Sequence, residues 1–373
     1  MHVKRADVIV VGGGIGGLAA AYAQARAGRT VRLLERADEF GEVGAGLQLG
    51  PNATRVLAGW GLLDEVAEKG VLPRRLVFRD AVSGEELTHL DLGEGFLRRY
   101  RGPYVVVHRS DLHRVLLQAC EREGVDLIRG CHAERVEHLP AGARVICADG
   151  SAYEGDVVLG ADGLGSGLRA GFVADGPVDS GFVAHRGTVP VAGLGVSLDE
   201  VVAWLGPDCH LVQYPLRRGA LLNQVAVFRG PGDPEAAFER CCDEVRGALA
   251  HLWRDRHWNM LDREPADTWV DGRVALVGDA AHPMLQYLAQ GACQALEDAQ
   301  VLAEQSAGHA GSWDDALAAY QRIRVPRTAR VQATARVWGD IWHVDGLGRT
   351  LRNELMRTRD PSDHRYTDWL YGL

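Results

Sequence analysis

Residues 8–17 read Val8-Ile-Val-Val-Gly-Gly-Gly-Ile-Gly-Gly17, a short apolar run that leads directly into a cluster of glycines. The apolar run predicts a buried strand, and three of the glycines have the spacing G-x-G-x-x-G. In this spacing Gly12 makes a tight turn, Gly14 lets the backbone approach a pyrophosphate, and Gly17 lets the following helix pack on the strand. The N–H groups at the start of that helix are free to bind phosphate. The residues expected around the phosphates are Gly12, Gly14, Ile15, Gly16 and Gly17.

The sequence after this stretch completes a strand–helix–strand unit. An alanine-rich segment with helical character is followed by a second apolar run at residues 30–34, and Glu35 stands at its end. An acidic residue about 20 positions after the glycines is typical of the side chain that binds an adenosine ribose hydroxyl. The glycines alone would also fit an ordinary tight turn in a chain with 46 glycines. The order of strand, glycine turn, helix, strand and acidic residue therefore indicates dinucleotide binding.

The choice between NAD and FAD depends on the rest of the chain. The glycine motif occurs once, so a separate nicotinamide-binding domain of the same kind is not expected. Two later motifs favour FAD: Asp162-Gly163 follows an apolar run, and Gly278-Asp279 ends another before a helical segment near Gly291. The carboxylate of Asp279 can accept hydrogen bonds from a ribityl chain, and free N–H groups at Gly291 and Ala292 can stabilise negative charge on the flavin. Asp162-Gly163 by itself is only a turn signal.

The composition excludes several classes of protein. The 373 residues carry 41 Lys and Arg against 50 Asp and Glu, a formal net charge of -9, and the scattered basic residues argue against a nucleic-acid binder. No apolar run approaches the roughly 18–20 residues that cross a bilayer, so no transmembrane segment is expected. The seven cysteines include no C-x-x-C pair and are interpreted as reduced structural residues of a cytoplasmic protein. No metal site is predicted.

The pattern along the chain predicts an α/β protein with a discontinuous, Rossmann-like FAD-binding domain. Strand–turn–helix patterns occupy residues 1–75, 102–176 and 272–325, which we assign to that domain. Alternating, β-rich segments at residues 76–101 and 177–271 are assigned to an antiparallel sheet that binds the substrate. Residues 326–373 are expected to form a helical C-terminal segment, because Pro326 should break or kink the helical pattern that precedes it.

These motifs together resemble those of a known family. The glycine turn at residues 12–17, Asp162-Gly163 and the stretch Gly-Asp-Ala-Ala-His-Pro at residues 278–283 occur in this order along the chain. The set resembles the single-component, FAD-dependent aromatic hydroxylases, class A flavoprotein monooxygenases built like 4-hydroxybenzoate hydroxylase. Residues 40–52 resemble the salicylate-hydroxylase branch. From end to end the chain is similar to the 3-hydroxybenzoate 6-hydroxylases, with the most specific matches at residues 77–80, 209–215, 222–228 and 352–372.

This resemblance implies a reaction. It points to NADH-dependent hydroxylation of 3-hydroxybenzoate by O2, para to the hydroxyl group, which forms gentisate (2,5-dihydroxybenzoate) through a C4a-hydroperoxyflavin. NADPH is an alternative co-substrate. A salicylate-type decarboxylating hydroxylase and a natural-product phenol hydroxylase are alternative enzymes, and a flavin-binding protein without turnover is an alternative of another class. The resemblance further implies a homodimer.

The resemblance also implies positions for the cofactor contacts. Glu35 is similar to the ribose ligand and Arg36 to its neighbour at the adenine end, whereas Gln48 and Arg109 look like contacts of the flavin and the pyrophosphate. Arg109 would equally fit a surface charge just before a helix cap. For His282, which precedes a proline, a structural role is favoured over a catalytic one. The later cofactor contacts are expected to be Asp162, Asp279, Gly291 and Ala292.

Hydroxylation needs an electron-rich phenol, and a base that removes the phenolic proton supplies one. His210 matches the catalytic histidine of the family, and an imidazole titrates near neutral pH. Tyr214 lies four residues further along a predicted strand, so both side chains are expected on one face. Gln286 matches the 3-hydroxybenzoate 6-hydroxylase pattern, and its amide can hydrogen-bond the substrate hydroxyl or carboxylate. Ala289 stands where the broader family has glycine, and no arginine stands out as the partner of the substrate carboxylate.

Overall fold

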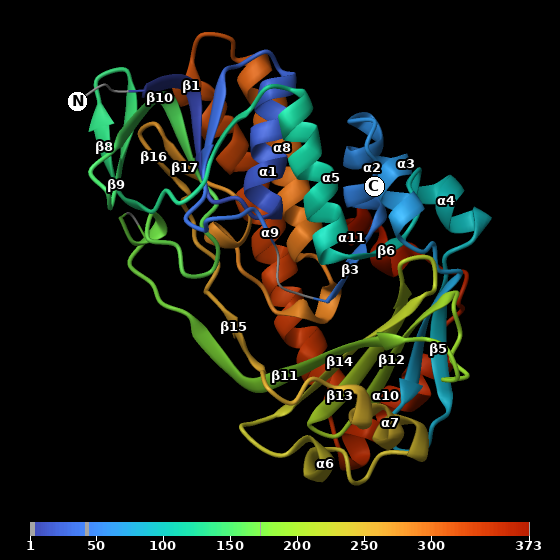
Figure 1. Cartoon of the computed structure of the whole chain (residues 1–373). Coiled ribbons are helices and arrows are strands. Elements are labelled where there is room, and N and C mark those ends of the chain that lie inside the picture. Colours follow the sequence, from blue (N-terminus) through green and yellow to red (C-terminus); the bar gives the residue numbers. More distant parts are fainter. Residues whose placement is uncertain (1–3, 42–44, 172, 373) are drawn as a thin grey trace.

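The computed structural model describes residues 4–41, 45–171 and 173–372, and Figure 1 shows two large sheets with long helices between them. Residues 42–44, within the stretch at 40–52 that resembles the salicylate-hydroxylase branch, lie outside the described residues. The architecture is α/β, as the sequence predicted. One sheet is largely parallel and is covered by helices, and the other is largely antiparallel.

The first sheet is built around parallel strands. The elements of this part are β1 (Lys4–Val11), α1 (Ile15–Arg26), β2 (Val31–Leu34), α5 (Arg109–Arg122), β7 (Asp126–Ile128), β8 (Ala133–Leu139), β9 (Gly142–Cys147), β10 (Ala152–Gly160), β16 (Val270–Asp271), β17 (Val274–Leu276) and α8 (Gly291–Gly308). The parallel strands lie in the order β17-β10-β1-β2-β7. Val8, Ile9 and Val10 of the central strand are fully buried, as expected where both faces of a parallel sheet are covered. Helix α1 packs against both α5 and α8.

The carboxyl ends of β1, β10 and β17 meet at one edge of this sheet, because parallel neighbours end on the same side. The turns after Val11, Gly160 and Leu276 therefore lie close together. Gly12, in the first turn, has φ +106°, and a Cβ there would collide with the carbonyl group of Ala161. Only glycine fits this position. In doubly wound sheets this edge is where dinucleotides bind.

The second sheet is assembled from two separated parts of the chain. Its order is β15-β11-β14-β13-β12-β4-β5. The strands are β4 (Arg75–Asp80), β5 (Glu86–Asp91), β11 (Val178–Pro190), β12 (Glu200–Gly206), β13 (Cys209–Leu216), β14 (Leu221–Arg229) and β15 (Trp258–Asp262). The sheet is antiparallel, as predicted, at every pair of neighbours except β4 and β12, which are parallel. The reason is that β4 and β12 are joined through the cofactor-binding half rather than by a hairpin.

A small sheet lies between the two large ones. It pairs β3 (Gly46–Leu49) with β6 (Val105–His108). The backbone N–H of Gly46 donates to Asn223 Oδ1 of β14 at 2.8 Å, and β6 contacts β13. This small sheet therefore ties the cofactor-binding half to the second sheet.

Helix α9 (Trp313–Trp342) continues through Pro326, so of the two predicted outcomes, a break or a kink, the break is wrong. The boundary expected between residues 325 and 326 falls inside one helix. A proline removes one helical N–H and costs about 3 kcal/mol. Buried contacts on both sides offset this cost: Arg324 donates to Asp298 Oδ1 at 2.7 Å, and Thr328 Oγ1 donates to the carbonyl of Arg324 at 3.1 Å.

The C-terminal tail returns to both halves. Helix α10 (Gly346–Arg357) packs on β5, and α11 (Asp368–Tyr371) packs on α2 (Pro51–Gly59). Arg349 and Arg352 of α10 form ion pairs with Asp80, which is fully buried at the end of β4. The remaining helices are α3 (Leu63–Lys69), α4 (Glu94–Tyr100), α6 (Pro234–Ala237) and α7 (Asp243–Ala248). Within residues 4–41, 45–171 and 173–372, no helix is both long and apolar enough to cross a membrane.

Candidate active site

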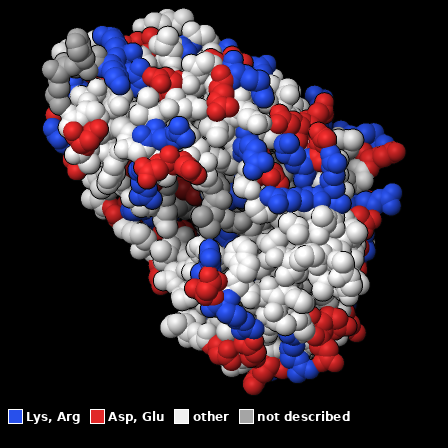
Figure 2. All heavy atoms as spheres, viewed as in Figure 1, with Lys and Arg blue, Asp and Glu red and all other residues white. Residues whose placement is uncertain are grey.

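One cavity of about 630 Å³ connects the two large sheets. Its wall includes the start of α1, the turn after β17, the start of α8 and one face of the second sheet. It therefore runs from the predicted dinucleotide site to the predicted catalytic residues. The predicted residues that line it are Gly14, Ile15, Gly16, Gln48, Arg109, His210, Tyr214, Asp279, Gln286, Gly291 and Ala292. On the face drawn in Figure 2, basic and acidic side chains are interspersed rather than gathered into a basic stripe.

The start of α1 offers free backbone N–H groups to this cavity. Gly14 is the N-cap, no side chain caps the helix, and the N–H of Leu18 donates to the carbonyl of Gly14 at 2.9 Å. The N–H groups of Ile15, Gly16 and Gly17 therefore precede the first intrahelical hydrogen bond. The helix dipole adds a partial positive charge at the same place. Such a helix start binds a pyrophosphate.

The start of α8 has the same character. It begins at Gly291, its N-cap Gln290 makes no side-chain cap, and Gly291 and Ala292 line the cavity. Asp279 is exposed in the same wall, and a Cβ on Gly291 would lie 3.8 Å from its Oδ1. Two uncapped helix starts and a carboxylate on one groove fit FAD. They match its pyrophosphate, its pyrimidine edge and the hydroxyls of its ribityl chain, respectively.

Five of the predicted cofactor residues lie outside the cavity wall: Gly12, Gly17, Glu35, Arg36 and Asp162. Glu35 Oε2 accepts a hydrogen bond from the N–H of Gly13 at 2.6 Å, which holds the glycine turn against the end of β2. Arg36 beside it is exposed. Asp162 accepts hydrogen bonds from Ser166 Oγ at 2.6 Å and from a backbone N–H at 3.3 Å, so its carboxylate closes its own loop. The assignments of these residues to the cofactor stay predictions.

Gln48 and Arg109 do lie in the cavity wall. Gln48, on β3, accepts a hydrogen bond from the hydroxyl of Tyr104 at 2.7 Å. Arg109 is the first residue of α5 and is half-buried. Arg109 therefore faces the cavity, and its assignment to the cofactor stays a prediction.

One face of the second sheet forms the other end of the cavity. His210, Val212 and Tyr214 alternate along β13 and all line the cavity, so the prediction that His210 and Tyr214 share a face is confirmed. The strand register extends this face sideways. Val212 pairs with Val225 of β14, and Val225 pairs with Arg186 of β11. Arg186 therefore lies in the same row as Val212, and it also lines the cavity.

His210 is almost completely buried, with 1% of its surface exposed. Its Nδ1 lies 2.8 Å from Nε2 of His343, and the rings of Tyr287 and Trp342 lie 5.4 and 5.0 Å from its own. Burial, and next the neighbouring His343, hold the pKa of His210 well below its ordinary value. His210 is therefore neutral at pH 7, and one of its two ring nitrogens carries a free lone pair.

Tyr214 and Gln286 supply neutral polar groups. Burial raises the pKa of Tyr214 above its ordinary value, against the opposing effect of Arg186, so the phenol keeps its proton at neutral pH. Gln286 begins a short 3-10 helix, Gln286–Leu288, and is half-buried. Ala289 follows with φ +52°, a left-handed conformation in which the glycine of the broader family would be unstrained.

Comparison with known proteins identifies the family. The sequence profile of a family described as "FAD binding domain" matches residues 5–204 and 235–335. The chain belongs to this family. A 3-hydroxybenzoate 6-hydroxylase of Polaromonas naphthalenivorans (strain CJ2) is 40% identical to it, over 98% of this chain and 95% of that protein. A 3-amino-4-hydroxybenzoate 2-monooxygenase of Streptomyces cremeus is 39% identical, over 98% of this chain and 94% of that protein.

The solved structures agree with the sequence relatives. Klebsiella pneumoniae HpxO complexed with FAD and uric acid is similar with a TM-score of 0.88 and 26% identity, over 99% of this chain and 97% of that one. The chain is thus a flavin-dependent aromatic monooxygenase, and its cofactor is FAD, as the sequence predicted.

Arg186 is a site residue of this monooxygenase that the sequence analysis missed. Its Nε is buried and has no hydrogen-bond partner among the described residues, and its guanidinium lies 5.0 Å from the ring of Trp258. Burial lowers its pKa, Tyr214 raises it and Arg109 lowers it further. A buried guanidinium without a carboxylate partner is costly. An anionic ligand would therefore stabilise it.

His282 has the structural role that the sequence favoured. It is fully buried, and its Nε2 lies 2.6 Å from Asp298 Oδ2. The same carboxylate accepts from the N–H of Gly278 at 2.9 Å, and Arg324 donates to its other oxygen. Burial would raise the pKa of Asp298, but His282 and Arg324 lower it. Asp298 therefore stays ionised and holds the turn that carries Asp279.

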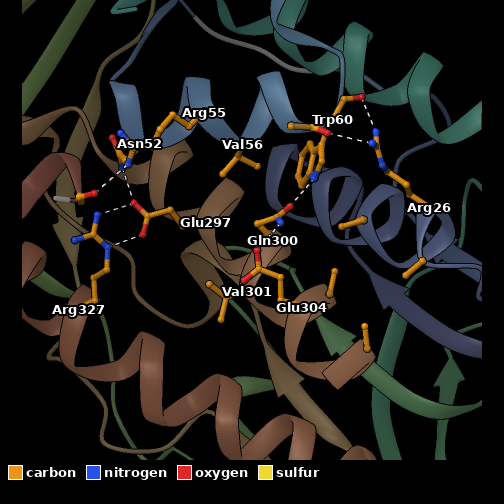
Figure 3. Close-up of a pocket in the computed structure, with 16 residues that line it drawn as sticks. Arg26, Asn52, Arg55, Val56, Trp60, Glu297, Gln300, Val301, Glu304 and Arg327 are labelled. Carbon is orange, nitrogen blue, oxygen red and sulfur yellow. Dashed lines mark hydrogen bonds and ion pairs between the residues drawn. The ribbon is translucent and has the colours of Figure 1, made fainter. Parts of the chain in front are cut away.

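A second cavity, of about 660 Å³, lies between α1, α2 and α8 (Figure 3). Its polar side chains bond to one another. Glu297 accepts from Asn52 at 2.6 Å and from Arg327 at 2.5 Å, and Trp60 Nε1 donates to Gln300 at 2.7 Å. Eleven of the predicted site residues line the first cavity, and none of them lines this one. The chemistry of the site therefore belongs to the first cavity.

Proposed function

We propose that this monooxygenase hydroxylates 3-hydroxybenzoate para to its hydroxyl group, which gives gentisate, with NADH as the reductant. One observation carries the proposal. A neutral buried imidazole, a phenol, an amide and a guanidinium, from His210, Tyr214, Gln286 and Arg186, line one cavity together with the residues that fit FAD. The 40% identity to a 3-hydroxybenzoate 6-hydroxylase supports the same substrate.

Each side chain has a role in this proposal. His210 accepts the phenolic proton, which leaves the aromatic ring electron-rich. Tyr214 and Gln286 hydrogen-bond the ring substituents and fix which carbon faces the flavin. Arg186 pairs with the carboxylate of the substrate, because its buried Nε has no hydrogen-bond partner among the described residues. FAD, when bound and reduced, supplies the activation of O2 and the oxygen transfer.

A second candidate follows from the Streptomyces relative. That protein is a 3-amino-4-hydroxybenzoate 2-monooxygenase, and its identity to this chain, 39%, is close to the 40% of the first relative. This substrate also has a phenol and a carboxylate, so His210 and Arg186 fit it equally. The choice depends on the amino group and on the position hydroxylated.

The decisive experiment is product identification with the FAD-loaded enzyme. We expect 3-hydroxybenzoate to stimulate NADH oxidation with gentisate as the product, and NADPH to be the poorer reductant. The panel includes 3-amino-4-hydroxybenzoate, salicylate, 4-hydroxybenzoate and a larger phenol. NADH oxidation that yields only hydrogen peroxide with 3-hydroxybenzoate contradicts the proposal. The homodimer implied by the resemblance is tested on the same sample by sedimentation equilibrium.

The role of His210 is tested by His210→Ala. Its turnover with 3-hydroxybenzoate should fall by about 10²–10⁴-fold if it removes the phenolic proton. The matched control is His185→Ala, a histidine of β11 that stacks on Phe228, 5.4 Å away, and is absent from the cavity wall. A loss of less than about fivefold in His210→Ala removes this residue from the role.

A further inference from the structure

A second histidine lies directly behind His210. His343, which ends α9, places its Nε2 2.8 Å from Nδ1 of His210, and the two rings stack at 5.1 Å. Phe182 stacks on His343, with its ring 4.3 Å away. His210 lines the cavity and His343 does not. The two imidazoles therefore form a hydrogen-bonded pair that leads away from the site.

The outer end of this pair approaches the surface. His343 keeps 7% of its surface exposed, and its carbonyl accepts from the N–H of Asp208 at 3.0 Å. Asp208 is half-exposed and pairs with Arg229 at 2.8 Å. The charged and titratable groups that face the pair are Asp208 of the β12–β13 turn, Arg229 of β14, Arg352 of α10 and Tyr287 beside His210.

A single buried imidazole would be a poor acceptor for a phenolic proton. Burial lowers the pKa of His343 to about 3, an effect that Asp208 opposes and that Arg229 and Arg352 reinforce. The pKa of His210 is likewise held well below its ordinary value. An imidazolium is therefore unstable on either ring, whereas the phenol, with an ordinary pKa near 10, releases its proton reluctantly.

We propose that His343 is a positioning residue that completes a two-histidine proton relay from the bound phenol to the surface, a role that rests on the proposed function. In the resting pair, each neutral ring carries its proton on Nδ1, and His210 donates Nδ1–H to His343 Nε2. When the phenolic O–H bond breaks, its proton passes to His210 Nε2. The Nδ1 proton of His210 then passes to His343 Nε2, and the Nδ1 proton of His343 leaves to water beside Asp208.

The relay leaves no buried cation. Both rings end neutral, with their protons on Nε2, the ligand is a phenolate, and one proton has entered the solvent. The movement of the second proton is what allows a ring that resists protonation to act as a base. His343 also selects the tautomer of His210 whose Nε2 is free to accept.

The test measures proton release on ligand binding, without turnover. FAD-loaded enzyme and 3-hydroxybenzoate are mixed in weak buffer with a pH indicator, and the ultraviolet absorbance of the bound phenolate is followed in parallel. His343→Gln keeps an oxygen that accepts Nδ1–H from His210 but cannot pass a proton on. His343→Phe removes both functions while keeping an aromatic ring beside Phe182. His185→Phe, on the same sheet and outside the cavity wall, is the control.

We expect the wild-type enzyme and His185→Phe to release about one proton per ligand with the phenolate signal. In His343→Gln and His343→Phe, ligand affinity should stay within about threefold, and proton release should slow by about 10²-fold. Release at the wild-type rate in His343→Gln refutes the relay and leaves the proposed function standing. A wild-type enzyme that does not bind 3-hydroxybenzoate refutes the proposed function, and the relay with it.

Discussion

Replacing Arg186 with methionine should weaken the binding of aromatic acids and raise the stability of the ligand-free enzyme. The guanidinium lines the cavity, and its buried Nε has no hydrogen-bond partner among the described residues. A buried polar group left without a partner costs about 1–3 kcal/mol. The stacking of Arg186 on Trp258 returns about 0.5–1 kcal/mol. The difference between these two effects is roughly 1 kcal/mol, so Arg186→Met should raise the unfolding free energy of the ligand-free enzyme by about that amount.

The loss of binding free energy for the aromatic acid should be larger than this gain in stability. A hydrogen bond from a charged group contributes about 1.5–3 kcal/mol, so the dissociation constant for 3-hydroxybenzoate should rise by roughly 10–150-fold. The neutral analogue 3-hydroxybenzyl alcohol lacks the carboxylate, and its affinity should change by less than about threefold. Titration of the flavin absorbance measures both constants on the FAD-loaded enzyme. Thermal unfolding without ligand measures the stability.

Arg79→Met is the matched control. Arg79 lies on β4 of the same sheet, and its guanidinium stacks on Trp204 at 5.3 Å, but it is not in the cavity wall. This variant should leave the ratio of the two dissociation constants unchanged. An equal loss of affinity for the acid and the alcohol in Arg186→Met would refute the carboxylate contact. A loss of bound FAD in that variant would instead indicate a contact with the cofactor.

Three further predictions concern stability and packing. Gly46→Ala should reduce turnover and lower the unfolding free energy by about 1–3 kcal/mol, as measured by denaturant titration. The reason is that the new Cβ would lie 2.8 Å from the hydroxyl oxygen of Tyr214 and closer still to its ring. Asp80→Asn should cost about 3–5 kcal/mol at pH 7, since it breaks a buried ion pair. Burial would raise the pKa of Asp80, but hydrogen bonds, the largest from Arg349, lower it. The stabilisation from the ionised carboxylate is therefore present above the unfolded pKa near 3.9 and is lost as the pH falls below it. In denaturant titrations at acid pH, the difference in unfolding free energy between the wild type and Asp80→Asn should shrink. Ala289→Gly should change the melting temperature by little or raise it, because the relief of about 1 kcal/mol of left-handed strain is set against the greater backbone entropy of glycine.

The parts of the site that could be predicted from the sequence are those whose geometry is local. The glycine turn places its residues through spacing alone, and the two-residue period of a strand places His210 and Tyr214 on one face. Arg186 could not be found in this way, because its place depends on the register of β11 against β14 and of β14 against β13. An arginine within a half-buried strand is the only signal that the sequence carries for it. Register between strands of distant origin is not visible in a single sequence.

Pro326 shows a different limit of sequence reasoning. The local cost of a proline in a helix is correctly read as unfavourable, but tertiary contacts decide whether the helix ends. The decisive contacts come from Arg324, whose side chain is 1% exposed and reaches Asp298 and Gln294 on α8. Together these contacts stabilise the continuous helix by more than the one hydrogen bond that Pro326 cannot make. Nothing in the local sequence around the proline shows that these partners lie within reach.

The continuity of α9 connects the two ends of the site. Near its middle, Arg324 holds Asp298, which fixes the turn carrying Asp279 at the cofactor end. At its C-terminal end the same helix packs Gly339 so tightly on Tyr287 that a Cβ there would lie 2.6 Å from the ring, and His343 follows directly behind His210. At ~1.5 Å per residue, the helix from Arg324 to its end spans about 27 Å. A break at Pro326 would let these two anchor points move independently, whereas one continuous helix holds His343, behind His210, at a fixed distance from the turn that carries Asp279.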